Sequence, residues 1–229
     1  MEKDSIFRFD QINIIADGLS RRALEAIQIQ VDNSDLDVKD TAITVFNPCP
    51  FPRKAVISCL VDMPDKMGYD AFALQTPDGK TLRVQQQEKF PMGVLVRNLQ
   101  DISVELRTQR VRCHVETEEI PAYGYSTYHV VRTPRFSFLP GTLAPETNVL
   151  ENEYLRVAFN SNGTLDMTHK ETGHTFTGLH YLEDSGEAGH SWIHQPPERD
   201  EIITSHGSPC QIALEESGPL FARMRVDYH

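Results

Sequence analysis

An alternation of apolar and polar residues with a period of two is the feature that most constrains how this chain can fold. It recurs in short runs, which we expect to be strands at residues 41–46, 55–61, 81–87, 103–115 and 125–131. The segment Asn47-Pro-Cys-Pro50 and the pair Asp78-Gly79 lie between runs, and both are typical of turns. Short strands at this spacing, with almost no helical pattern, predict a β-sandwich.

A second group of strands follows a segment rich in turn-forming residues. Residues 132–145 contain three prolines and a glycine, which predicts a domain boundary there. The next strand is expected at 150–159, and Asn162-Gly163 predicts a tight turn before a return strand at 165–170. Residues 178–208 are rich in Gly, His, Pro and acidic residues, so we expect a long loop there. A last strand is expected at 221–228.

One helix is expected near residues 11–31, because apolar residues recur there at steps of three and four. These residues are Ile12, Ile15, Leu19, Ala23, Ile27 and Val31. An apolar stripe on a lone helix needs a partner, and we expect other helices of a bundle to provide it. The last strand would likewise leave an open sheet edge. From both features we expect the chain to be a segment of a longer protein.

Charge and composition exclude several classes of function. The chain has 22 Lys and Arg residues against 33 Asp and Glu residues, a formal net charge of −11. Nucleic-acid grooves and polybasic membrane anchors need an excess of basic residues, so we expect neither partner. No apolar run approaches the roughly 20 residues of a membrane-spanning helix. The first residues do not resemble a signal peptide, and we expect a cytoplasmic protein.

The cysteines and histidines show no regular pattern of metal ligands. Cys49, Cys59, Cys113 and Cys210 lack Cys-x-x-Cys spacing, so we expect small buried residues and neither a disulfide framework nor a zinc site. His190 and His194 would share one face of a helix, with Asp184 and Glu187 nearby. However, Pro196-Pro197 and several glycines argue against a helix, and His-Glu-x-x-His is absent. We expect these loop histidines to be solvated and the chain to bind no metal.

Trp192 is the only tryptophan, and it lies in the polar segment 189–197. Aromatic rings stack on the apolar faces of sugars, so this position suits a carbohydrate contact. The alternative is a ring that holds the loop against the sandwich. The residues alone leave both interpretations open.

Five segments in order resemble the region that follows the catalytic domain in glycoside hydrolase family 38. Residues 11–24 resemble the last helix of that family's three-helix bundle, and residues 44–53 resemble a strand and turn with the motif Val-Phe-Asn-Pro. Residues 152–173 resemble a signature with Asn-Gly and Lys-x-Thr-Gly, and residues 181–187 and 218–226 follow in the same order. The bacterial branch, which includes α-mannosidases and mannosylglycerate hydrolases, is the most similar.

The resemblance implies a mainly β fold in three segments. Residues 1–34 would be a helix from the end of a bundle, residues 35–140 a small immunoglobulin-like β-sandwich, and residues 141–229 the first part of a large galactose-mutarotase-like β-sandwich. The parent protein would be a zinc-dependent retaining α-mannosidase. Its zinc and its aspartate nucleophile would lie in an N-terminal domain, before this chain begins. We therefore expect this chain to contain no catalytic residue and no metal ligand, and to be inactive alone.

The resemblance also implies a site residue and partners. The family's aromatic-x-aromatic-x-Pro pattern aligns with residues 192–196, where His194 replaces the second aromatic. Trp192 and His194 are therefore the expected substrate-binding residues. The expected partners are a mannose-containing glycan or mannoside and the remainder of the chain's own protein, with a homo-oligomer left open. The alternatives are a stand-alone carbohydrate-binding sandwich and a purely structural interaction domain.

Overall fold

The structure is a computed structural model that describes residues 2–34, 36, 40–65, 71–96 and 102–229. The chain divides into two compact units, which are described separately. Unit 1 comprises Met1–Arg53, Leu74–Thr81 and Ile120–Val131. Unit 2 comprises Lys54–Ala73, Leu82–Glu119 and Arg132–His229. This grouping does not test the three segments expected from the sequence, which stay a prediction.

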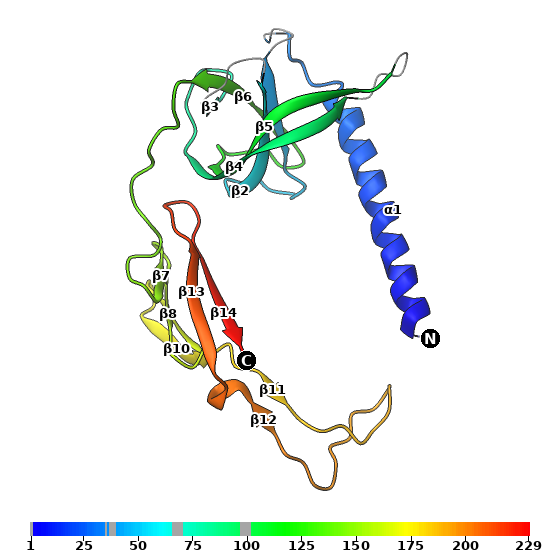
Figure 1. Cartoon of the computed structure of the whole chain (residues 1–229), viewed down its shortest axis with the longest axis vertical. Coiled ribbons are helices and arrows are strands. Elements are labelled where there is room, and N and C mark those ends of the chain that lie inside the picture. The colour runs from blue at the N-terminus through cyan, green and yellow to red at the C-terminus, as the bar shows by residue number, and fades with distance from the viewer. Residues whose placement is uncertain (1, 35, 37–39, 66–70, 97–101) are drawn as a thin grey trace. The chain divides into compact units, whose positions relative to one another are not determined.

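Unit 1 begins with the helix α1 (Glu2–Gln28), drawn in blue in Figure 1. It starts before the expected residue 11, where Ile6 and Phe9 continue the apolar steps of three that lead to Ile12, and it ends before residue 31. The stripe itself is exposed: Ile12, Ile15 and Leu19 each keep 59–60% of their surface. Over the described residues, no helix combines the length and apolar character that a membrane crossing requires.

A three-stranded sheet has the order β1 (Thr41–Phe46), β6 (Tyr125–Thr133), β3 (Ala71–Gln75). Strand β1 has the expected bounds and pairs antiparallel with β6. The turn after β1 is fixed by Asn47, which is buried. Its side-chain amide donates hydrogen bonds to the carbonyl oxygens of Phe51, Ile120 and Pro121 at 2.9–3.1 Å. The Asn47 side chain therefore connects the turn after β1 with the segment at Ile120 and Pro121 that precedes β6.

In unit 2, the antiparallel strands β2 (Val56–Pro64), β5 (Val104–Glu116) and β4 (Val84–Val96) form a sheet in that order. Strand β4 is longer than expected because it continues through Pro91 and Gly93. It lies at the sheet edge, where a proline can be tolerated without losing a central ladder bond. One face of β2 and β5 is buried and carries Val61, Met63, Val111, Cys113 and Val115.

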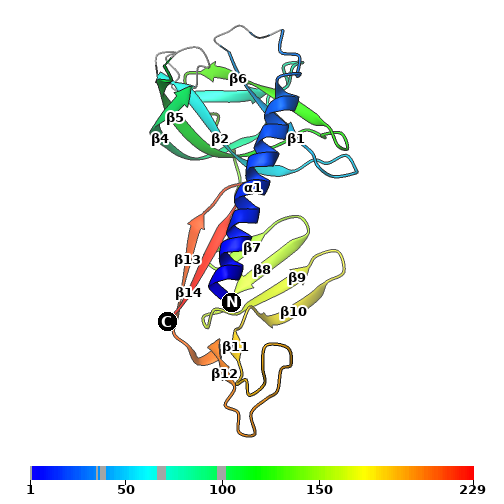
Figure 2. The ribbon, with the colours of Figure 1, turned by 90° about the vertical axis from the view of Figure 1, so that its right-hand side faces the viewer.

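A second sheet of unit 2 has the order β10 (His174–Leu179), β9 (Leu165–His169), β8 (Leu155–Phe159), β7 (Val149–Glu151) and is visible in Figure 2. The single strand expected at 150–159 is two strands, because the Asn152 side chain accepts the N–H groups of Tyr154 and Leu155 and turns the chain. The predicted turn at Gly163 is confirmed. Its φ is +83°, and a Cβ there would lie 2.5 Å from the Tyr228 hydroxyl.

The remaining elements of unit 2 are short pairs of strands. The expected long loop contains β11 (Glu183–Asp184), β12 (Ile203–Thr204) and a 3-10 helix at Ser205–Gly207. Strand β13 (Cys210–Glu216), like β3 and β10, was not predicted, and it pairs antiparallel with β14 (Arg223–Tyr228). The expected fold class, a mainly β chain of antiparallel sheets preceded by one helix, is confirmed.

Candidate functional site

The two predicted binding residues lie in the loop between β11 and β12, whose base is held by polar and stacking contacts. The Leu182 N–H donates to Ser205 Oγ, and the Ser205 N–H donates to the Leu182 carbonyl, both at 2.9 Å. The ring of Tyr181 stacks on that of His206 with centroids 4.8 Å apart. These contacts flank the antiparallel pairing of β11 with β12, which holds the two ends of the loop side by side.

Glu187 organises the middle of the loop. Its carboxylate accepts the N–H groups of Gly189 and Gln195 and a hydrogen bond from Nδ1 of His194. These bonds, first those from Gln195 and Gly189 and then that from His194, lower the pKa of Glu187 below its ordinary value. We call residues 186–195 the Glu187 hairpin.

Backbone pairing completes the Glu187 hairpin. The Ala188 N–H donates to the Gln195 carbonyl at 2.8 Å, while His190 and Ile193 exchange two backbone hydrogen bonds at 2.9 and 3.1 Å. A Cβ on Gly189 would lie 2.1 Å from the Ile193 carbonyl oxygen, so the close approach of the two arms requires glycine. The segment is a hairpin and not a helix, as Pro196-Pro197 had indicated.

Trp192 lies at the tip of the Glu187 hairpin, and 90% of its surface is exposed. The interpretation in which its ring packs on a sheet is therefore wrong for this structure. Its backbone N–H is 3.4 Å from Nδ1 of His190. An exposed indole on an ordered hairpin can stack on the apolar face of a sugar. The polar side chains of His194 and Glu187 belong to the same hairpin.

The sequence predicts Trp192 and His194 as binding residues but does not predict that Glu187 organises their loop. The structure brings all three into one hairpin, with His194 bonded to Glu187 and Trp192 two residues away. The only sequence signal for Glu187 is an acid placed two residues before a glycine and seven before a histidine. That signal is weak because two of the three bonds are made by backbone groups.

Zinc is the metal that the family resemblance implies, and the loop histidines do not fit it. Among residues 2–34, 36, 40–65, 71–96 and 102–229, no group of three or more His, Cys, Asp or Glu side chains could hold a metal ion. His194 is bonded to Glu187, and His190 faces a backbone N–H. The expectation that the chain binds no metal stays a prediction.

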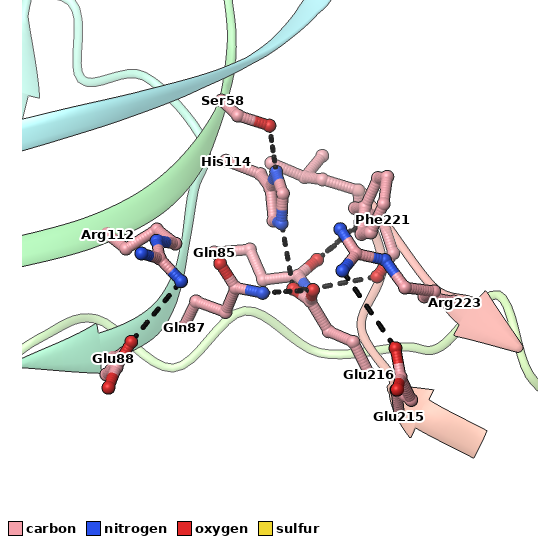
Figure 3. A network of polar contacts seen from close by, with 11 residues as sticks. Ser58, Gln85, Gln87, Glu88, Arg112, His114, Glu215, Glu216, Phe221 and Arg223 are labelled. Carbon is pink, nitrogen blue, oxygen red and sulfur yellow. Dashed lines mark hydrogen bonds and ion pairs between the residues drawn. The ribbon is translucent and has the colours of Figure 1, made fainter. Parts of the chain in front are cut away.

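A second polar cluster connects β5 and β4 with the β13–β14 hairpin of unit 2 (Figure 3). Glu216 Oε1 accepts hydrogen bonds from Nε2 of His114 at 2.8 Å and from Nε2 of Gln85 at 3.1 Å. The Gln85 amide also bonds to backbone groups of Leu220 and Phe221 at 2.9–3.0 Å. The His114 ring stacks on Phe221 at 4.2 Å.

This cluster has the composition of a Ser–His–carboxylate triad but not its geometry. Ser58 Oγ lies 2.9 Å from Nδ1 of His114, and Glu216 is on Nε2. A serine nucleophile is activated from Nε2 while the carboxylate holds Nδ1. The order is reversed here, and the His114 side chain is only 3% exposed. We therefore assign the cluster a structural role.

Comparison with known proteins finds a match in structure alone. No protein-family model matches the chain, and no curated protein matches it. The structure of an α-mannosidase from Enterococcus faecalis V583 matches 97% of this chain and 27% of its own, with a TM-score of 0.82 and 21% identity. A glycosyl hydrolase family 38 protein from Enterococcus faecalis matches 97% of this chain and 28% of its own, with a TM-score of 0.81 and 21% identity.

This chain has the fold of one part of these two proteins, one titled an α-mannosidase and the other a glycosyl hydrolase family 38 protein. It spans little more than a quarter of their length. The resemblance drawn from the five sequence segments is thus confirmed at the level of the fold. The match does not test the family 38 assignment of Trp192 and His194 to substrate binding, and both stay predictions.

Proposed function

We propose that the chain is the β region of a family 38 glycosidase that hydrolyses α-mannosides. The observation that carries this proposal is the match over 97% of the chain to an α-mannosidase fold. The sequence segments that resemble the family in the same order support it independently. The proposed enzyme is retaining and uses zinc, and its nucleophile and metal ligands belong to a catalytic domain outside residues 1–229.

Within that enzyme, we assign the Glu187 hairpin a role at the sugar site. Trp192 supplies an apolar surface for the sugar ring, and His194, oriented by Glu187, supplies a polar contact. A mannose-containing glycan or mannoside is the proposed ligand. The exposure of Trp192 supports this role, because a large aromatic side chain that is 90% exposed gains little from burial in its own chain.

The single tryptophan makes the site directly observable. All tryptophan emission of the chain comes from Trp192, so titration with methyl α-mannoside should shift and quench this emission until it saturates. Because the hairpin supplies only part of a site, we expect a Kd in the millimolar range, about −4 kcal/mol or weaker. Methyl α-galactoside should have a smaller effect.

A calorimetric titration provides the matched control. Trp192→Ala should abolish the heat of mannoside binding, whereas Phe138→Ala, which removes another aromatic side chain with 88% exposure, should leave it unchanged. Equal binding by Trp192→Ala and the unmodified chain would overturn the role of the hairpin. A different result would favour the stand-alone carbohydrate-binding domain. In that case the chain would bind mannoside, but no hydrolysis would be measured even when the longer protein is assayed.

A further inference from the structure

Two of the four cysteines face each other across neighbouring strands. Cys59 on β2 is paired in register with Cys113 on β5, and their sulfur atoms are 3.5 Å apart. Both belong to unit 2. Cys113 is fully buried, whereas Cys59 is partly exposed. No sequence pattern predicts this pairing, because 53 residues separate the two positions and no spacing motif links them.

The backbone geometry suits a covalent bond. Directly opposed residues in antiparallel strands have Cα atoms about 4.5–5.5 Å apart, and a disulfide accepts Cα separations of about 4.4–6.8 Å. The sulfur atoms must approach to about 2.05 Å, which side-chain rotation can achieve without moving the strands apart. Both thiols are free in this structure.

We propose that Cys59 and Cys113 form a reversible redox modification site, in which a hydroperoxide converts the two thiols into a cross-strand disulfide. The proposal does not depend on the proposed glycosidase function. It follows from the register of β2 and β5, the short distance between the sulfur atoms and the unequal access of the two side chains.

The reaction balances with hydrogen peroxide as the oxidant. The Cys59 thiolate attacks one peroxide oxygen, the O–O bond breaks, and hydroxide leaves and takes up the thiol proton as water. The sulfur of Cys113 then attacks the sulfur of the Cys59 sulfenic acid. The S–O bond breaks, and a second water leaves with the Cys113 proton. Two thiols have lost two electrons, and the peroxide has been reduced to two waters.

The two cysteines have different roles in this reaction. The hydrogen bond with Cys113 lowers the pKa of the Cys59 thiol, while the same bond and then burial raise the pKa of the Cys113 thiol. The thiolate is the nucleophile, so Cys59 is the residue that attacks peroxide. Cys113, which is buried, is the resolving residue. A dithiol reductant would return both to the thiol state by exchange at the more accessible Cys59 sulfur.

The disulfide would join the two strands beside the polar cluster formed by Ser58, His114, Gln85 and Glu216. Ser58 and His114 form the next register pair along β2 and β5 and point to the opposite face. The new bond would therefore fix the strands that present His114 to Glu216. Oxidation should make this part of unit 2 more resistant to unfolding.

The test uses the whole chain with Cys49→Ser and Cys210→Ser, so that only the pair remains. Treatment with hydrogen peroxide should remove both titratable thiols and about 2 Da of mass per chain, and dithiothreitol should restore both. Peptide mapping should show residues 59 and 113 linked within one chain. The midpoint of thermal unfolding should rise by about 5–10 °C on oxidation and fall back on reduction.

A third substitution, Cys59→Ala, in this background supplies the control. It removes the partly exposed thiol and should leave the buried Cys113 thiol slow to react. The idea is overturned if peroxide adds oxygen atoms to the pair instead of linking it, if both thiols survive, or if disulfide forms only between chains. Persistence of the thermal shift in the Cys59→Ala chain would equally contradict it.

Discussion

Replacing Glu216 with alanine removes an acceptor that several side chains share. In the structure its carboxylate accepts hydrogen bonds from His114, Gln85 and Gln87. The Glu216 side chain is 10% exposed and that of His114 is 3% exposed, so water cannot simply take the place of the carboxylate at the histidine. We expect the substitution to destabilise unit 2.

The magnitude follows from the donors left behind. A buried donor without a partner costs about 1–3 kcal/mol, and the loss of one ordinary hydrogen bond costs about 1 kcal/mol. His114 loses its Nε2 partner, whereas Gln85 keeps its bond to the Phe221 carbonyl, and Gln87 is exposed. The free energy of unfolding should therefore fall by about 2–4 kcal/mol, which lowers the thermal midpoint by about 5–15 °C for a domain of this size.

The neighbouring residue provides a matched control. Glu215 is 32% exposed and contacts Arg225 at 2.9 Å and Arg223 at 3.9 Å. Exposed ion pairs of this kind contribute about 0–1 kcal/mol, so Glu215→Ala should change the midpoint little. Glu216→Gln, which keeps one carbonyl acceptor, should fall between the two. Calorimetric scans of all three variants test this, and equal midpoints for Glu215→Ala and Glu216→Ala would refute the reasoning.

Four further outcomes are expected. In the proposed family 38 enzyme, Trp192→Ala should lower kcat/KM by about five- to thirtyfold, because sugar stacking is worth about 1–2 kcal/mol. The thermal midpoint should stay unchanged, and a large fall in midpoint with normal turnover would contradict the site. The lowered pKa of Glu187 implies stabilisation that is complete above its ordinary pKa of 4.5 and lost as pH falls through the folded value. Trp192 emission should therefore change in acid below pH 4.5, and Glu187→Gln should remove that transition. The purified chain should hold less than one zinc per molecule by elemental analysis, and a full equivalent would show that the loop histidines were misjudged. The chain alone should not hydrolyse an aryl α-mannoside, and turnover that survives repurification would disprove this.

The strands were predictable where the sequence carries the period of two and a clear turn. Strand β1 was found with its exact ends, and the Asn162-Gly163 turn was found because an asparagine–glycine pair tolerates positive φ. The extension of β4 through Pro91 could not be foreseen, since it depends on β4 lying at a sheet edge. Strand β10 was missed because the expected loop begins at Gly178, inside the strand, and the strand's first four residues are all exposed, so no buried face marks it.

The polar clusters were less predictable than the strands, for a physical reason. Glu216 lies 102 residues from His114, so their contact depends on tertiary packing and leaves no local pattern. Glu187 bonds mostly to backbone N–H groups, which every residue except proline carries. Trp192 was identifiable because a lone indole in a polar segment is unusual by itself. The sequence thus led to Trp192, the residue that we propose contacts a ligand, but not to Glu187, which orders the hairpin that carries it.

The carboxylates of Glu216 and Glu187 stabilise different parts of the molecule, and this difference bears on the proposed function. Glu216 on β13 accepts hydrogen bonds from the buried His114 on β5 and from Gln85 on β4, so it contributes to the folding of unit 2. Glu187 lies on the surface and orders only its own hairpin, so its loss should scarcely affect the sheets. What it fixes is the backbone that carries Trp192. A ligand that stacks on an already ordered indole loses less conformational entropy on binding than one that must order a mobile loop. Glu187→Gln should therefore weaken mannoside binding even though the indole side chain of Trp192 is itself unchanged.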